Sequence, residues 1–164
     1  YNLKLDREPT SEEVWDSIDD CKKYDEIVFC GYGEPTLRLD TIKEVSRKIK
    51  EAGGKIRLNT NGHGNVINKR NILPELKGLV DSISISLNAD TAEAYDRIVR
   101  PLPGLRNEIY DRVKEFIEEA KKYIPEVQAT IVTHQEGVDE EKCEEMSKNE
   151  FDVKYRPRRY NIVG

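Results

Sequence analysis

The residues best suited to chemistry come directly after an apolar run, in the segment Gly31-Tyr32-Gly33-Glu34-Pro35. The glycines remove side chains there, so backbone carbonyls can face a ligand group such as an ammonium. Pro35 fixes the turn, and Glu34 either adds negative charge or supports the loop through hydrogen bonds to backbone N–H groups. These residue types predict a loop that binds a polar or cationic group. The alternative is an ordinary strand–helix turn, in which glycine and proline are common.

Polar side chains also end the later apolar runs of the chain. The candidates at these ends are Asn59, Thr60, Asn61, Ser86, Asn88 and Arg156. Because ligands lie at the carboxyl ends of strands in parallel α/β folds, we expect a site for a polar, zwitterionic or nucleoside-like molecule. The alternatives are turn-capping roles for the asparagines, a helix N-cap role for Asn88 or Asp90, and ion pairs between Arg156 and helix carboxylates.

Both histidines of the chain, His63 and His134, lie just past predicted strands. A histidine titrates near neutral pH and could therefore act as an acid or a base. A solvated position in a loop is the simpler interpretation, and we expect it for both residues. No residue of the chain is assigned as catalytic from its type and spacing.

The elements that must position these residues alternate between strand and helix patterns. Short apolar, β-branched runs predict strands at residues 26–31, 55–60, 82–87, 127–133 and 151–156. Apolar residues at helical spacing predict helices at residues 11–24, 39–54, 91–101, 107–123 and 139–149, with a short turn at 74–79 and a tail at 157–164. This alternation, with short connections, predicts a parallel sheet with right-handed crossovers.

Two architectures fit this order: an open doubly wound sheet and an incomplete β/α barrel. The third strand places Ser82, Ser84 and Ser86 on one face and apolar residues on the other. A central strand of a doubly wound sheet is apolar on both faces, so the serine face favours the barrel. We therefore expect one α/β domain over residues 1–164, folded as a partial parallel barrel.

Charge, apolar content and cysteine spacing indicate where in the cell the protein is found. The net charge of −5 gives no global attraction to nucleic acid or to a membrane surface. No apolar run approaches the ~20 residues of a membrane-spanning helix, and no signal peptide opens the chain. The cysteines Cys21, Cys30 and Cys143 are too widely spaced for a CxxC pair. We expect reduced thiols in the cytoplasm, with Cys30 in the core because of its position in a strand.

Three motifs in order carry a resemblance to a known family. "GYGEP" (31–35) resembles the GGEP motif of radical S-adenosylmethionine (radical SAM) enzymes, and "NTNG" (59–62) is similar to their TNG segment. "ISISLNA" (83–89) resembles the strand that follows. The combination is most similar to the TatD-associated radical SAM proteins, over roughly residues 1–160.

The resemblance implies S-adenosylmethionine as the small-molecule cofactor. It implies that residues 31–35 bind the methionine amino group, partly through backbone carbonyls, and that the end of the strand at 82–87 faces the ribose or the methionine carboxylate. It implies reductive cleavage of the cofactor to a 5′-deoxyadenosyl radical that removes a hydrogen atom from a substrate. The substrate itself stays open.

One departure from the family pattern concerns the metal. Radical SAM enzymes hold a 4Fe–4S cluster on a CxxxCxxC loop, and this chain has no such segment. Its three distant cysteines cannot supply clustered thiolates, so no metal ligands are assigned. We expect that the cluster belongs to a longer parent protein, that the first strand and the cluster loop of the family precede Tyr1, and that the chain alone is inactive.

Two other functions remain open from the sequence. One is a non-redox β/α-barrel enzyme that uses Glu34 or His63 as general acid or base. The other is a binding module without chemistry. In the radical SAM interpretation, the strand at 26–31 has an open edge, and we expect a second copy or a chain terminus to pair along it.

Overall fold

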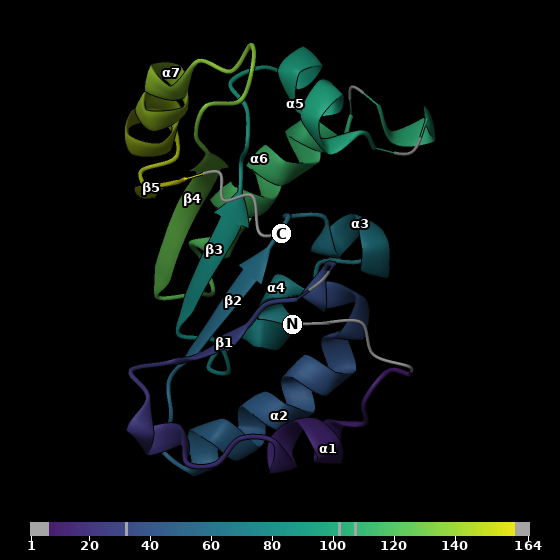
Figure 1. Ribbon diagram of the computed structural model, residues 1–164, viewed down its shortest axis with the longest axis vertical. Coiled ribbons are helices and arrows are strands. Elements are labelled where there is room, and N and C mark those ends of the chain that lie inside the picture. The colour runs from purple at the N-terminus through teal and green to yellow at the C-terminus, as the bar shows by residue number, and fades with distance from the viewer. Residues whose placement is uncertain (1–6, 32, 102, 107, 160–164) are drawn as a thin grey trace.

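The chain folds around one sheet of five parallel strands, each paired with the strand that follows it in sequence. The structure, a computed structural model, describes residues 7–31, 33–101, 103–106 and 108–159 (Figure 1). The strands are β1 (Ile27–Phe29), β2 (Ile56–Thr60), β3 (Ser82–Ser86), β4 (Glu126–Val132) and β5 (Lys154–Arg158). Their sequential order and parallel direction confirm the predicted α/β class.

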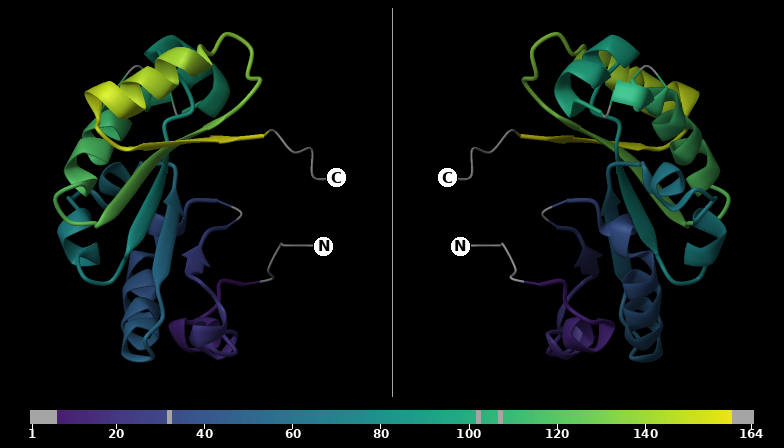
Figure 2. Two further views of the ribbon diagram at one scale, coloured as in Figure 1. Left: turned by 90° about the vertical axis from the view of Figure 1, so that its left-hand side faces the viewer. Right: turned by 90° about the vertical axis from the view of Figure 1, so that its right-hand side faces the viewer.

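Helices connect the strands and cover one face of the sheet (Figure 2). The α-helices are α1 (Ser11–Asp16), α2 (Leu39–Glu51), α3 (Gly64–Asn68), α4 (Leu73–Leu76), α5 (Ala92–Val99), α6 (Ile109–Ala120) and α7 (Glu140–Glu145). Shorter 3₁₀ turns lie at Cys21–Lys23, Pro35–Arg38 and Pro103–Leu105, and a π-helical turn lies at Met146–Glu150. In the described part of the chain, no helix is long and apolar enough to cross a membrane.

The core lies between the sheet and these helices. Its strand residues are apolar and fully buried, and they pack in one cluster with the apolar stripes of α2 and α6. The members at its centre are Val45, Ile49, Ile56, Leu58, Ile83, Ile85, Val113, Phe116 and Ile131. Because side chains alternate along a strand, this core uses every second strand residue and leaves the others on the opposite, open face.

The open face is polar, as the serine face of β3 predicts. Ser84 accepts hydrogen bonds from Arg57 Nη1 at 3.2 Å and from Gln128 Nε2 at 2.5 Å, so it joins β2, β3 and β4. Ser82 donates to Glu26 Oε2 at 3.4 Å. A curved parallel sheet with helices outside and hydrogen-bonded polar residues inside confirms the predicted partial barrel.

The first predicted helix is wrong in its length. Instead of one helix over residues 11–24, α1 ends at Asp16 and a separate 3₁₀ turn forms at Cys21–Lys23. The cause is local, because short polar side chains compete with the helical backbone. Ser17 Oγ donates to the carbonyl of Val14, and the Asp20 side chain accepts from the N–H of Lys22 and starts the new turn.

The last strand and its expected tail also differ from the prediction. β5 begins at Lys154 rather than at residue 151, because Phe151 still closes the π-helical turn through its N–H to the carbonyl of Met146. Pro157 and Arg158, expected in the tail, belong to β5. A proline is tolerated there because β5 pairs only with β4 in the described chain, so the missing N–H falls on an edge strand.

Cys30 is exposed, so its predicted place in the core is wrong. β1 ends one residue earlier, at Phe29, and Cys30 follows two residues after Val28. Val28 faces the open side of the sheet and is 39% exposed. The apolar run at 26–31 therefore buries only one of its faces.

Candidate functional site

The loop after β1 is held by the carboxylate of Glu34, which caps the 3₁₀ turn Pro35–Arg38. Its Oε1 accepts hydrogen bonds from Thr36 N at 3.1 Å, Thr36 Oγ1 at 2.7 Å and Thr60 Oγ1 at 2.7 Å. Its Oε2 accepts a bond from the backbone N–H of Asn61 at 2.7 Å. Four bonds to one carboxylate therefore join the loop after β1 to the end of β2.

The two glycines of this loop leave open space beside the backbone. A Cβ placed on Gly31 or on Gly33 would meet no atom within 4 Å. Gly33 has a φ of 136°, a conformation that favours glycine. Pro35 occupies the start of the 3₁₀ turn, where its missing N–H is not needed. Tyr32 lies outside the described residues. Gly31 is exposed, and no other part of the described chain packs against it, so a ligand could occupy the space beside it.

The end of β2 is ordered by its own side chains. Asn61 Oδ1 accepts the N–H of His63 at 2.8 Å, so this oxygen closes the turn, as the turn-capping alternative predicts. His63 Nε2 lies 2.7 Å from the hydroxyl of Tyr95, which comes from α5 and is fully buried. The prediction of a solvated His63 is therefore wrong. Burial lowers the pKa of His63 and raises the pKa of Tyr95, so both groups are neutral at neutral pH.

Two asparagine side chains near the open face carry buried oxygen atoms without a partner. Asn59 Oδ1 on β2 and Asn88 Oδ1 after β3 are inaccessible to solvent and have no hydrogen-bond partner in the described chain. A buried carbonyl oxygen without a partner costs about 1–3 kcal/mol of desolvation. Ser46 Oγ and Thr133 Oγ1 are also buried without a partner in the described chain, so this property alone does not identify a site. What sets the two asparagine oxygens apart is their place at neighbouring strand ends, where they are free to accept a donor from outside the described residues.

The backbone at Asn88 is strained as well. Its φ is 61°, and the N–H of Ala89 donates back to the carbonyl of Leu87 at 2.8 Å, which makes Asn88 the centre of a γ-turn. The helix N-cap alternative is wrong for this residue, because Thr91 caps α5 by accepting the N–H of Ala94 at 3.2 Å. Lys69, Arg100, His134 and Asp152 also have positive φ, so the turn supports a ligand site at Asn88 only together with the partnerless oxygen.

The structure brings most predicted residues to one edge of the sheet. Neighbouring strands β1, β2 and β3 end in the Glu34 loop, in Asn59–Asn61 and in Ser86–Asn88. Arg156 lies two strands from Ser86, because Thr130 of β4 pairs with both residues. It is exposed, and the described chain shows no ion pair to a helix carboxylate for it.

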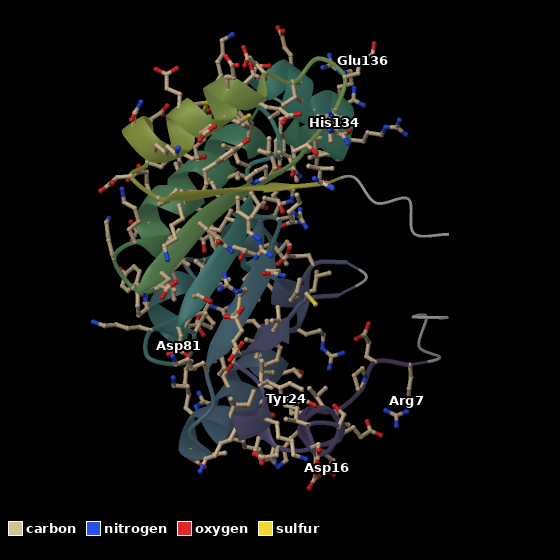
Figure 3. All side chains as sticks on the ribbon, turned by 60° about the vertical axis from the view of Figure 1, so that its left-hand side comes forward. Arg7, Asp16, Tyr24, Asp81, His134 and Glu136 are labelled. Atoms are coloured by element: carbon tan, nitrogen blue, oxygen red, sulfur yellow. The ribbon has the colours of Figure 1, made fainter. Side chains whose placement is uncertain are left out.

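His134 follows β4 and is exposed, as predicted (Figure 3). Its backbone N–H donates to Glu140 Oε1 at 2.7 Å. In the described residues, no hydrogen bond joins its imidazole to the residues that order the strand ends.

The comparisons with known proteins agree with this arrangement. The family model described as "Radical SAM superfamily" matches residues 1–148, which include β1 to β4 and exclude β5. The chain belongs to the radical SAM superfamily. A protein of Methanocaldococcus jannaschii, named as a candidate glycyl-radical enzyme activating enzyme, is 31% identical over 149 residues. That match covers 90% of this chain and 59% of the relative, so the chain spans about three fifths of the relative's length. No solved structure matches.

The cysteines of this radical SAM chain do not fit a 4Fe–4S cluster. Cys21 and Cys143 are buried and Cys30 is exposed, and all three are free thiols. Burial raises the pKa of Cys143 to about 12, which disfavours the thiolate that iron requires. In the described part of the chain, no group of three or more His, Cys, Asp or Glu side chains could hold a metal ion.

An ion pair on the open face was not predicted from the sequence. Glu26 Oε1 accepts a hydrogen bond from Arg57 Nε at 2.6 Å, and this bond lowers the pKa of Glu26. Arg57 in turn donates to Ser84, so the pair belongs to the polar interior of the partial barrel. The alternation of Ile56, Arg57 and Leu58 is the signal that could have placed a charged residue on the inner face.

Proposed function

We propose that this chain is the S-adenosylmethionine-binding part of a radical SAM enzyme, with the cofactor at the carboxyl ends of β1, β2 and β3. The observation that carries the proposal is the pair of buried, partnerless oxygens of Asn59 and Asn88, one of them on a strained turn. Both atoms accept hydrogen bonds, so a ligand for this edge must carry donors. The cofactor has them in its ammonium, its ribose hydroxyls and its adenine amino group.

The roles of the loop residues follow from their geometry. We assign the methionine ammonium to the carbonyls of Gly31 and Gly33, beside the open space that these glycines leave. Glu34 acts through position, because its carboxylate is engaged with Thr36, Thr60 and Asn61. Pro35 starts the turn that fixes Glu34.

The strand ends complete the proposed site. The Asn59 and Asn88 side-chain oxygens accept hydrogen bonds from hydroxyl or amino groups of the ligand. Ser86, two residues before Asn88, ends β3 on the face that also carries Ser82 and Ser84. Asn61 orders the turn after β2, because its Oδ1 accepts the N–H of His63. Arg156 lies on β5, two strands from Ser86, and we assign it no contact with the cofactor. When bound, S-adenosylmethionine supplies the radical chemistry of the superfamily. The chain's own residues hold and orient it.

We propose that cleavage of the cofactor belongs to a longer protein and that this chain alone is inactive. The chain spans 59% of its curated relative, and its three thiols do not fit the iron–sulfur cluster. The free thiols also support a cytoplasmic location. The TatD association stays a prediction, and the substrate stays open.

The acid–base alternative has less support from the geometry. All four hydrogen bonds of Glu34 go to its own chain, and His63 Nε2 is bonded to a buried hydroxyl. A general base needs a free lone pair within reach of substrate. A binding module without chemistry is the other alternative. Binding of S-adenosylmethionine at the strand ends would favour the proposal over this alternative.

A titration followed by amide NMR shifts tests the proposal. S-adenosylmethionine should shift the amides of Gly33, Glu34, Ser86 and Asn88. The affinity should be weak, in the upper micromolar range or poorer, which corresponds to roughly −5 to −6 kcal/mol. Shifts centred away from the strand ends would contradict the proposal.

A matched pair of glycine variants sharpens this test. Asn88→Gly removes the partnerless oxygen and relaxes a φ of 61°, so it should fold at least as well and bind at least ~5-fold more weakly. His134→Gly is the control, because His134 has a φ of 63° at the next strand end and an exposed side chain. It should bind the cofactor as the wild type does. Unchanged binding in Asn88→Gly would remove the main support for the site.

A further inference from the structure

Positive charge is concentrated on the open side of β5. Arg156 pairs in register with Thr130, and Arg158 pairs with Val132, so both lie on the same face of the strand as Lys154. Both arginines are exposed, and no hydrogen bond or ion pair of their side chains occurs in the described chain. Lys154 differs, because it lies 3.1 Å from Glu126 in an ion pair.

This charge is not neutralised by its surroundings. Arg57, the other arginine of the open face, is paired with Glu26 at 2.6 Å. Arg156 also acts on Glu26, whose pKa it helps to lower, but only through space. In a chain with a net charge of −5, two guanidinium groups left unpaired on one strand form a local anion-attracting surface.

The chemistry of the pair selects the kind of anion. Guanidinium groups present planar N–H donors that match the paired oxygens of a carboxylate or a phosphate. Two arginines separated by one residue lie about 7 Å apart along a strand, so their long side chains can converge on one group. Pro157 between them offers no N–H to the ligand or to a neighbouring strand.

The position of the pair distinguishes it from the proposed ammonium site. Figure 2 shows β5 and the loop after β1 on opposite sides of the open face. Four strand spacings separate β1 from β5, which is roughly 19 Å along the sheet at about 4.8 Å per strand. The carboxylate of S-adenosylmethionine shares a carbon with its ammonium, so a cofactor held at Gly31–Gly33 keeps that carboxylate near β1. The curvature of the sheet lets Arg156 act on Glu26 beside β1, but the loop after β1 and β5 remain separate parts of the open face, so β5 is available to a different anion.

We propose that Arg156 and Arg158 bind a carboxylate or phosphate group of the substrate. The inference rests on the proposed function, because it takes the cofactor to lie over β1 to β3. The register Ser86–Thr130–Arg156 then places the anionic group two strands from Ser86, at the edge of the proposed cofactor site. The substrate is thus an anionic molecule that lies between the cofactor and β5.

Inorganic phosphate is the probe for this site, added at constant ionic strength and followed by amide NMR shifts. It should shift residues 154–158 with saturation, and Arg156→Gln with Arg158→Gln should weaken this binding at least ~10-fold. Lys154→Gln is the matched control, because it removes a positive charge from the same face of β5 but from an ion-paired side chain. It should leave phosphate binding unchanged. Equal binding in the wild type and the double variant would overturn the inference.

A second titration separates the two sources of an anion. Phosphate should bind equally well with and without saturating S-adenosylmethionine, and the double variant should keep the cofactor affinity of the wild type. Displacement of phosphate by the cofactor, with weaker cofactor binding in the double variant, would assign the arginines to the methionine carboxylate and overturn the substrate site. Cofactor binding without phosphate binding defeats the inference alone. Phosphate binding at β5 without cofactor binding at the strand ends defeats the proposed function.

Discussion

Glu34 accepts hydrogen bonds from two backbone N–H groups and two hydroxyls. A glutamine could not replace it well, because its amide nitrogen would face the N–H donor now bound to Oε2 or the donors now bound to Oε1. The carboxylate is therefore specific to its place, even though it touches only its own chain. An acidic residue in a glycine-rich loop need not contact a ligand in order to shape its site.

His63 should make the stability of the fold depend on pH. Burial lowers its folded pKa below the ordinary value of 6.5, although the charge of Glu34 partly opposes this. As pH falls below about 6.5, the unfolded chain takes up a proton before the folded chain does. The free energy of unfolding should then decrease, by at most about 1.4 kcal/mol per pH unit, until the folded histidine is protonated too.

The chain supplies its own control for this prediction, because His134 is its other histidine and is exposed. Urea unfolding midpoints between about pH 5 and pH 7 should vary less in His63→Gln than in the wild type. His134→Gln should keep the wild-type dependence. An identical pH dependence in all three proteins would place the titrating group elsewhere.

At the scale of the elements, the strands were predictable and their faces only partly so. β-Branched apolar runs located all five strands. The rule that ligands bind at strand carboxyl ends selected Glu34, Asn59 and Asn88 as members of one candidate site. The prediction of a buried Cys30 was wrong because an apolar run does not show whether one face of β1 or both faces are buried. The prediction that the chain leaves the sheet at Pro157 was wrong because a proline interrupts a strand only at a position that must donate an N–H to a neighbouring strand.

The contacts that order the candidate site could not be predicted from the sequence, because they join residues that are far apart along the chain. Glu34 meets Thr60 26 residues later, and His63 meets Tyr95 32 residues later. Periodicity reports on neighbours within one element, whereas these pairs depend on how separate elements pack. The candidate list could thus be derived from residue types, but only the fold shows which of these side chains bond within the chain and which have no partner in the described residues.

The turn after β2 should tolerate substitution less than the turn before β3. Gly62 and Gly78 both have positive φ, 82° and 75°. A Cβ on Gly62 would lie 3.0 Å from Ile85 Cγ2 and 3.1 Å from Val113 Cγ1, whereas a Cβ on Gly78 would meet nothing within 4 Å. Gly78→Ala should cost about 1–2 kcal/mol of unfolding free energy for its backbone alone. Gly62→Ala should cost a further ~1–3 kcal/mol because of the crowding.

Urea unfolding of the two variants measures this difference. Because both glycines carry the same kind of backbone penalty, their comparison isolates the packing of the β2 turn against β3 and α6. Equal destabilisation would mean that Ile85 and Val113 move aside without cost. The site would then rest on a softer turn than its close contacts indicate.

At the scale of the whole molecule, the two edges of the sheet differ in the chemistry of their exposed side chains. β1 and β5 each have one neighbour in the described chain, so the partial barrel is open between them. The β5 edge carries the exposed arginines, which repel a second copy of the same strand. β1 is apolar, and Val28 on it is 39% exposed. Two other large apolar side chains, Tyr24 and Leu37, are exposed in the segments before and after this strand.

We expect a second copy of the chain to pair along β1. The N–H of Ile27 points toward β2 and donates to the carbonyl of Lys55 at 2.7 Å. Val28 therefore directs its N–H and carbonyl away from the sheet, and an edge of this kind is a template for strand pairing. Light scattering should show a mass that rises with protein concentration, and the amide of Val28 should become protected from hydrogen exchange as it does.

Two lysine variants distinguish strand pairing from general hydrophobic contact. Val28→Lys places a charge on the edge strand and should keep the chain monomeric. Leu37→Lys removes a more exposed apolar side chain, but from a 3₁₀ turn that offers no strand edge, so association should persist. A chain that stays monomeric at every concentration, with fast exchange at Val28, would mean that the edge is simply solvated. Association lost in Leu37→Lys but kept in Val28→Lys would move the contact away from the sheet.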